Sequence, residues 1–351
     1  MRVKRRGAVP AFVATALACG LLAGCGGSSS GADVQSITLY NGQHPQTTDM
    51  LAAAFEKKTG ITVNVRSDDE DVLAQQIVTE GSHSPADVIF TENSPALEYL
   101  QANGLLARVK AATLAATPAR YDSPRGDWVG VSARVSVLIY NPHLIASSKL
   151  PSSVMQLADA RYKGLLALAA GETDFQPIVT SVLHAHGKAA TLRWLAGLKL
   201  NAARHLYPDN ETVTDDVNRG LAALGIINQY YWYRLRAVNG AAGTPSKIAY
   251  FAPRDPGYVV DVSGTAVLKS SPHQAAAQKF LSFLVSKQAQ QIIGARSARS
   301  DSASYEYPLA SGVITAAAET PFSALQPDPI TIGQLGDGSL AVDLLRQAGL
   351  L

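Results

Sequence analysis

The chain has 351 residues, of which 17% are charged, and its formal net charge at pH 7 is +2. Arg2, Lys4, Arg5 and Arg6 open the chain; without these four, 26 of the 30 basic residues remain against 28 acidic ones, which gives a net charge of −2. No basic stripe remains, so we expect no nucleic-acid partner. The length suits two domains that bury most of their apolar surface, and we expect a monomer.

The N-terminus has the order of a secretory signal, with basic residues first, then an apolar run over 8–23, then small residues. The run is too short for a comfortable membrane span. It ends in LAGC, which resembles the lipobox of bacterial lipoproteins, whose signal is cut before the Cys and whose Cys thiol receives lipid. We therefore expect a signal peptide over 1–24, lipid on Cys25, and a flexible tether over 25–35. Cys19 lies in the signal, so the mature domain has no disulfide.

The first third of the mature chain alternates between strand and helix patterns. We predict strands at 36–40, 61–65 and 86–90, and helices at 47–58, 72–80 and 95–103. Gly60 ends the first helix, as helix C-termini prefer. This order predicts an α/β fold with a mostly parallel sheet. Ligands of such sheets bind beyond the carboxyl ends of the strands, so the loops after Tyr40 and Phe90 are candidate functional segments.

The later part of the chain continues the α/β pattern and suggests a second domain inserted into the first. We predict strands at 135–140, 165–169, 221–227, 247–251 and 258–262, and helices at 212–219 and 274–284. Thr212 and Asp215 have the spacing of a capping box, although Asp replaces the usual Glu or Gln. We expect lobe 1 to comprise 36–134 plus 261–311, and lobe 2 to comprise 135–260 plus 312–351. Crossing strands between them imply a cleft that closes on a ligand.

Polar and aromatic residues follow several of the predicted strands. They are YNGQH at 40–44, TEN at 91–93, ETD at 172–174 and NQYYWY at 228–233. Together with the segments SPADVIFTEN, APRDPGYVVDVSGTAVLKSS and EYPL, they are similar to segments of the periplasmic ferric-ion-binding proteins. The similarity runs, with small gaps, from about Ser36 to the C-terminus.

The resemblance implies a two-lobed periplasmic-binding-protein fold of class II, with two crossover strands and a ligand cleft between the lobes. It implies the solute-binding subunit of an ABC importer, which carries ferric iron, bare or as a chelate, to a membrane permease and its ATPase. With the predicted lipid anchor, the protein would be exported and held at the outer face of the cytoplasmic membrane.

Matched to the family motifs, His44, Glu92, Tyr230 and Tyr231 are the implied metal ligands. Ferric iron is a hard cation that favours oxygen donors. A free phenol has a pKa of about 10, so only a strong Lewis acid holds two phenolates at neutral pH. Two phenolates and one carboxylate neutralise Fe³⁺, and an octahedral ion keeps two further places for water or an anion.

The chain departs from the family where some relatives cradle phosphate with a Ser-Gly-Ala-like segment. It has Glu172, Thr173 and Asp174 there, and two carboxylates repel phosphate. We expect the polar side chains that can bond an anion or water to be Asn93, Asn210 and Asn228. Arg134 can pair with carbonate, which is therefore favoured over phosphate. Direct ligation of the metal by Glu172 or Asp174 stays open as the alternative.

The same residues allow other interpretations. A tyrosine cluster is most often packing, and Glu172 and Asp174 can simply favour a helix N-terminus. The acidic run at 68–71 is typical of a solvated loop and helix start. An organic cation such as thiamine or a polyamine could stack on the tyrosines and pair with Glu92. Beyond the predicted tether, no GxSxG, P-loop or HExxH motif is present, so we expect no enzyme.

Overall fold

The computed structural model describes residues 35–295, 304–310, 312–313 and 320–351. The predicted signal peptide, Cys25 and all of the tether except residue 35 therefore lie outside the described residues. The described elements belong to the compact unit Val34–Leu351. Within this part of the chain, no helix has the length and apolar character needed to cross a membrane.

The described residues form nine strands and eleven α-helices. The strands are β1 Ser36–Gly42, β2 Thr62–Ser67, β3 Val88–Thr91, β4 Val129–Tyr140, β5 Leu166–Ala167, β6 Leu224–Asn228, β7 Lys247–Ala249, β8 Val260–Val267 and β9 Tyr307–Pro308. The helices are α1 Pro45–Thr59, α2 Glu70–Glu80, α3 Ser94–Ala102, α4 Ala111–Leu114, α5 Gln176–Ala202, α6 Asn210–Arg219, α7 Gln229–Asn239, α8 Gln274–Leu284, α9 Lys287–Gly294, α10 Ile332–Leu335 and α11 Ser339–Gln347.

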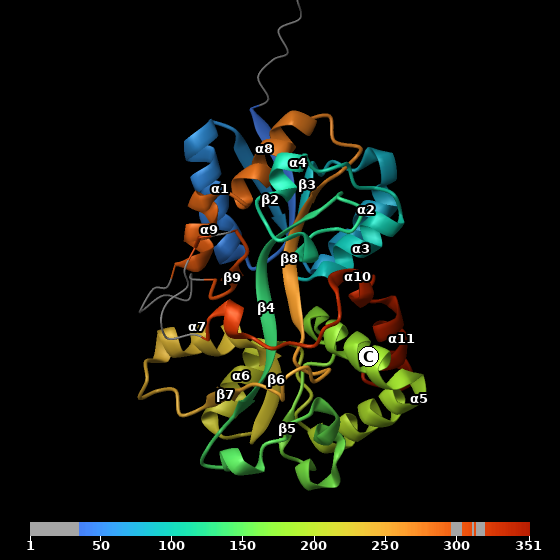
Figure 1. Ribbon diagram of the computed structural model, residues 1–351, viewed down its shortest axis with the longest axis vertical. Helices are drawn as coiled ribbons and strands as arrows, with labels where there is room; N and C mark the ends of the chain where they lie inside the picture. Colours follow the sequence, from blue (N-terminus) through green and yellow to red (C-terminus); the bar gives the residue numbers. More distant parts are fainter. Residues whose placement is uncertain (1–34, 296–303, 311, 314–319) are drawn as a thin grey trace, which may run out of the picture. The chain divides into compact units, whose positions relative to one another are not determined.

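The strands form one sheet with the order β2-β1-β3-β8-β4-β6-β5, and β7 and β9 both pair with β4. β1 is parallel to β2 and to β3, as the alternating pattern predicts. By their residue numbers, β1, β2 and β3 fall in the predicted lobe 1, and β5, β6 and β7 fall in the predicted lobe 2. Helices cover both faces of the lobe 1 strands, with α1, α8 and α9 on one side and α2 and α3 on the other (Figure 1).

Two long strands, β4 and β8, run from one lobe to the other (Figure 1). The first half of β4 pairs with β8, from Val129 opposite Thr265 to Val135 opposite Val260. Its second half pairs with β6, starting at Ser136 opposite Asn228. The two crossover strands predicted from the family resemblance are therefore confirmed, whereas the exact residue ranges of the lobes stay a prediction.

The crossing strands are longer than their sequence patterns indicate. β4 begins at Val129 rather than at residue 135, and β8 continues to Val267 rather than ending at 262. All 12 residues of β4 are buried, so the strand lacks the alternation that marks a half-exposed strand.

The predicted capping box is wrong, because Asp209 precedes α6 and its side chain accepts the Thr212 backbone N–H at 2.6 Å.

Apolar residues pack on both faces of the lobe 1 strands. One cluster joins these strands to α1 and α8, where the rings of Phe55 and Phe280 lie 5.0 Å apart. A second cluster covers the other face and continues through β4 into lobe 2, where it includes Trp194 on α5. Both clusters consist of residues of the compact unit Val34–Leu351.

Candidate functional site

The carboxyl ends of β1 and β3 bring two predicted ligands together. The strands are parallel neighbours with Gly42 opposite Thr91, so the residues that follow them leave the sheet side by side. His44 precedes α1, and Glu92 precedes α3. His44 Nδ1 lies 3.2 Å from Glu92 Oε1. The position of these two residues therefore follows from the parallel pairing in lobe 1.

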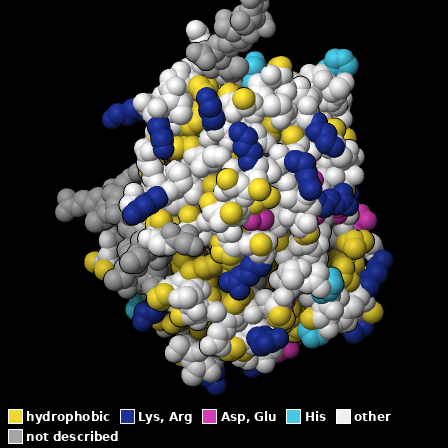
Figure 2. All heavy atoms as spheres, turned by 45° about the horizontal axis from the view of Figure 1, so that its top comes forward, with side chains coloured by type: hydrophobic (Ala, Val, Ile, Leu, Met, Phe, Trp, Pro, Cys, Tyr) yellow, Lys and Arg dark blue, Asp and Glu magenta, His cyan; other side chains and the backbone are white. Residues whose placement is uncertain are grey.

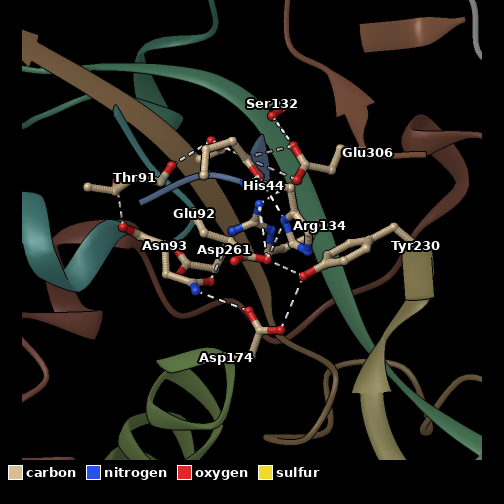
Figure 3. A network of polar contacts seen from close by, with 12 residues as sticks. His44, Thr91, Glu92, Asn93, Ser132, Arg134, Asp174, Tyr230, Asp261 and Glu306 are labelled. Atoms are coloured by element: carbon tan, nitrogen blue, oxygen red, sulfur yellow. Dashed lines mark hydrogen bonds and ion pairs between the residues drawn. The ribbon is translucent and has the colours of Figure 1, made fainter. Parts of the chain in front are cut away.

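The two tyrosines reach the same place from lobe 2. β6 ends at Asn228, and Tyr230 and Tyr231 lie in the first turn of α7. The Tyr230 hydroxyl donates a hydrogen bond to the Glu92 carboxylate, a contact that joins the lobes (Figure 3). The His44 ring centroid lies 5.3 Å from that of Tyr230 and 5.9 Å from that of Tyr231. All four predicted ligands are thus brought together, while their role as ligands stays a prediction.

A third polar segment joins the site where α5 begins. Asp174 lies in the 3₁₀ turn Thr173–Phe175 just before α5, and its Oδ2 accepts from the Tyr230 hydroxyl at 3.2 Å. Asn93 and Asn210 donate to the same carboxylate at 3.0 and 3.1 Å. This side chain is buried, whereas Glu172 is only partly buried and lines the cleft. The acid nearest the tyrosines is therefore Asp174 rather than Glu172.

Two more of the predicted residues, Thr173 and Asn228, lie around Asp174. Thr173 accepts a hydrogen bond from Asn93 at 3.2 Å. Asn228 lines a small cavity of about 10 Å³ together with Asp174 and Asn210. Such a volume is the smallest that holds one water molecule. These polar side chains surround the Asp174 carboxylate on the lobe 2 side.

Arg134 lies buried behind the predicted ligands, on the crossing strand β4. Its Nη2 is 2.6 Å from Glu306 Oε1 and 4.0 Å from Glu92 Oε1, and its Nη1 donates to Asn93 at 3.2 Å (Figure 3). Burial works against the charge of Arg134, but the carboxylates of Glu306 and Glu92 raise its pKa. For the same pair, burial opposes the charge of Glu306, yet Arg134 lowers its pKa overall. The guanidinium that we predicted to pair with an anion is therefore paired with Glu306.

Gln43 orients the imidazole ring of His44. Gln43 Oε1 lies 2.9 Å from His44 Nδ1, and a carbonyl oxygen can only accept, so Nδ1 carries the proton. Gln43 Nε2 donates to Ser263 at 2.7 Å and to Glu306 at 3.2 Å, which fixes the amide in this orientation. The second nitrogen, Nε2, keeps its lone pair free for a cation.

Glu70 supports the loop that carries Glu92. Its carboxylate accepts the backbone N–H groups of Glu92 and Asn93 at 2.7 and 2.8 Å, and the Asn93 amide at 3.1 Å. Glu70 is 3% exposed, so the expectation of a fully solvated acidic run at 68–71 is wrong for this residue. Gly42 makes the close approach possible, because a Cβ there would lie 2.4 Å from the Glu70 Cβ.

Burial is the main influence on the ionisable groups of the site. Burial raises the pKa of the Glu92 carboxyl well above its ordinary value, and the Asp174 carboxylate raises it further. Burial and Asp174 likewise raise the pKa values of Tyr230 and Tyr231. Burial lowers the pKa of His44. Without a cation the site therefore favours neutral His44 and protonated tyrosines, and a bound cation would displace these protons.

The site opens into a cleft of about 440 Å³ that is lined by acidic side chains. Besides His44, Glu92 and Tyr231, its acidic walls are Asp68, Asp69, Glu70, Asp71, Glu172 and Glu211. In the described part of the chain, no Lys or Arg lines this cleft. Burial and Asp174 raise the pKa of Glu172 to about 8. A cleft of this character attracts cations and disfavours anions.

The described residues contain no group of three or more His, Cys, Asp and Glu side chains arranged to hold a metal ion. The predicted set has one His and one Glu, and its other two ligands are phenol oxygens. The predicted metal site therefore depends on Tyr230 and Tyr231. Two guanidinium groups lie near the Tyr230 ring, Arg134 at 5.5 Å and Arg234 at 4.7 Å from its centroid, and they favour the phenolate form.

Comparison with known proteins gives the family. A model of the bacterial extracellular solute-binding proteins matches residues 41–291. The chain belongs to this family. The solute-binding protein is 37% identical to the Fe(3+)-binding periplasmic protein of Serratia marcescens over 335 residues, which cover 95% of this chain and 96% of the relative.

Two further proteins agree with this assignment. The solute-binding protein is 34% identical to the major ferric iron-binding protein of Neisseria meningitidis serogroup B over 316 residues, 90% of this chain and 93% of the relative. Its fold matches the crystal structure of iron-bound HitA from Pseudomonas aeruginosa with a TM-score of 0.83 at 39% identity, covering 90% of this chain and 99% of that chain. The two-lobed periplasmic-binding fold is thereby confirmed.

Proposed function

We propose that this solute-binding protein binds ferric iron in the cleft between its lobes and delivers it to an ABC permease. The observation that carries the proposal is the convergence of four side chains from both lobes: His44, Glu92, Tyr230 and Tyr231. The relatives carry ferric-iron-binding names, which does not favour an organic cation as the cargo. Binding and release are the function, with no chemical turnover.

We propose that Asp174 supplies a further oxygen ligand or accepts a hydrogen bond from an iron-bound water. Its carboxylate already reaches the Tyr230 hydroxyl at 3.2 Å. The acidic cleft, with Glu172 beside Asp174, opposes phosphate, so carbonate is favoured over phosphate as a small anion that completes the coordination. The Arg134 guanidinium is held by Glu306 and lies 4.0 Å from Glu92. It therefore adds positive charge beside the iron ligands without contacting them closely.

Export and anchoring complete the proposal. The N-terminal sequence supports a cleaved signal and a lipid on Cys25, which would hold a monomer at the outer face of the cytoplasmic membrane. The permease and its ATPase would then receive iron when the lobes open. Protons compete with Fe³⁺ for the phenolates, so mild acid favours release.

The test is a titration of the lipid-free domain, from Gly26 onward, with a ferric chelate while visible absorbance is recorded. A saturable one-to-one tyrosinate-to-iron charge-transfer band is expected, and the double variant Tyr230→Phe/Tyr231→Phe should lack it. Tyr233→Phe, on the same helix α7, is the matched control and should keep the band. If the wild-type protein does not show the band, tyrosine-ligated iron is not its cargo.

A further inference from the structure

One end of lobe 1 carries a group of exposed cations that the cleft does not use. We call it the basic end, and it consists of Lys57, Lys58, Arg108, Lys110, Lys269 and Lys279, all exposed. It lies where β1 begins, while the cleft lies where β1 ends (Figure 1). The whole mature chain has a net charge of −2, so this concentration of positive charge is a local asymmetry.

Hydrogen bonds and a cation–ring contact join the elements that carry these residues into one surface. Thr62 donates its backbone N–H to Gln35 at 2.8 Å, so the start of β1 lies beside the end of α1, where Lys57 and Lys58 are. Lys58 Nζ is 5.6 Å from the ring centroid of Phe283 on α8.

The same surface continues along α8 to the segment before α4. Gln278 on α8 donates to the Arg108 carbonyl at 2.8 Å and accepts the Lys110 backbone N–H at 3.2 Å. Lys279 follows on the same helix. Lys269 donates to the Gly104 carbonyl at 2.6 Å, which places it beside the start of this segment. The basic end is therefore continuous from α1 to β8.

Acidic side chains do not neutralise the basic end. No Asp or Glu occurs between Val262 and Ala295. In the segment 104–126 the one acid, Asp122, is buried. Glu56 on α1 is engaged by the backbone N–H of Val63 at 2.7 Å, and Asp87 is buried. Figure 2, in which this end is turned toward the viewer, shows many Lys and Arg side chains and only small acidic patches.

We propose that the basic end lies against the anionic phospholipid headgroups of the membrane to which the protein is anchored. The inference rests on the proposed lipid on Cys25. That residue lies ten positions before Gln35, the first described residue, so an extended tether spans at most about 36 Å to the domain. The anchor therefore keeps this end, rather than lobe 2, within reach of the headgroups. A lipid chain and a basic surface together form the two signals that give stable attachment.

The proposed orientation has a consequence for solute capture. β1 has seven residues between the basic end and the cleft, which corresponds to about 23 Å of extended strand. The cleft would then be held away from the headgroups. Its acidic walls would also be separated from the anionic surface, which would otherwise repel them.

The experiment measures binding of the lipid-free domain, from Gly26 onward, to vesicles by co-sedimentation at low salt. Because the protein carries neither lipid nor iron, the result is independent of the anchor and of the proposed cargo. Vesicles of phosphatidylglycerol and phosphatidylcholine in equal parts should bind it, and vesicles of phosphatidylcholine alone should not. Binding should fade as salt is raised, because the attraction is screened.

The variant neutralises four lysines of the basic end, and the control neutralises four exposed lysines of lobe 2. The variant is Lys57→Gln/Lys58→Gln/Lys110→Gln/Lys279→Gln, and the control is Lys149→Gln/Lys163→Gln/Lys188→Gln/Lys247→Gln. Both change the net charge equally. Each lysine near the surface contributes about fivefold to binding, so the variant should bind more than 100-fold more weakly and the control should match the wild type.

Equal losses in the variant and the control would overturn the proposal, because net charge alone would then explain binding. Absence of binding by the wild type to the anionic vesicles would also overturn it. If the same four-lysine variant then lost capture by the cognate permease in detergent, the basic end would be a protein docking surface instead. Circular dichroism melting of both variants confirms that these exposed substitutions leave the fold intact.

Discussion

Replacing Glu306 by Gln tests whether the buried ion pair behind the site keeps Arg134 away from the iron ligands. In the wild type, Arg134 Nη2 is 2.6 Å from Glu306 and 4.0 Å from Glu92. Glu306→Gln preserves the shape of the side chain but removes its charge. We expect the guanidinium to turn toward Glu92, where it would compete with Fe³⁺ for the carboxylate.

Two magnitudes follow from this geometry. Closing the Arg134–Glu92 gap to a contact of about 2.8 Å adds about 2 kcal/mol of attraction at an effective dielectric constant of about 20. Because iron must displace this contact, its affinity should fall about 20-fold. Breaking a buried ion pair from one side also costs about 3 kcal/mol of folding free energy, a large part of the total stability of a domain.

Affinity is measured by competition with a chelator of known ferric affinity, and stability by urea unfolding of the apo protein. Glu80→Gln, at a carboxylate that bonds Tyr40 and Gln76 in lobe 1, is the control and should leave iron affinity unchanged. The reasoning is refuted if Glu306→Gln binds iron as tightly as the wild type and unfolds within about 1 kcal/mol of it.

Three further predictions concern residues around the site. Burial raises the pKa of Asp261 to about 6; the folded state thus holds a proton that the unfolded state releases, and stability from this group is lost as pH rises through 6. Between pH 5 and pH 8, the wild type should lose about 1 kcal/mol more stability than Asp261→Asn, as measured by urea unfolding of the apo protein. Glu70→Ala leaves the N–H groups of Glu92 and Asn93 without their acceptor, and iron affinity in the chelator competition should fall about 10- to 100-fold. Gly42→Ala forces a Cβ against Glu70, and urea unfolding should show a loss of about 1 to 3 kcal/mol; unchanged stability would contradict the close approach.

Local signals in the sequence were enough to predict most of the elements that build lobe 1. Gly60 ends α1 in the left-handed conformation and donates its N–H to the Glu56 carbonyl, as a C-terminal glycine does. The amphipathic pattern gave the bounds of α8, Gln274–Leu284, without error. Because β1 and β3 are parallel neighbours, the residues after them could be placed at one edge of the sheet. The proximity of His44 and Glu92 follows from this pairing.

The supporting residues could not be found in the same way, because their partners are distant in sequence. Glu306 is the first residue of the matched segment EYPL, but it bonds Arg134 across 172 positions, and no local pattern links the two residues. Glu70 looked like part of a solvated acidic run, and its burial depends on the approach of α2 to Gly42. Gln43 was part of a matched motif, but its role depends on Glu306. Sequence reasoning thus found the groups that face the ligand more readily than the groups that hold them.

The crossing strands β4 and β8 also determine what a stable fragment of this protein can be. Each crossing strand pairs along part of its length with strands of lobe 1, and β4 pairs with β6 and β7 of lobe 2 along its remaining residues. A cut between the lobes would leave each half with an unpaired strand end that is buried in the intact protein, and such an end is prone to aggregate. Neither lobe is therefore an autonomous folding unit. The chain must be synthesised as far as β9 before the sheet of lobe 1 can be complete, since β8 and β9 are the last of the described strands in the sequence and pair with β3 and β4.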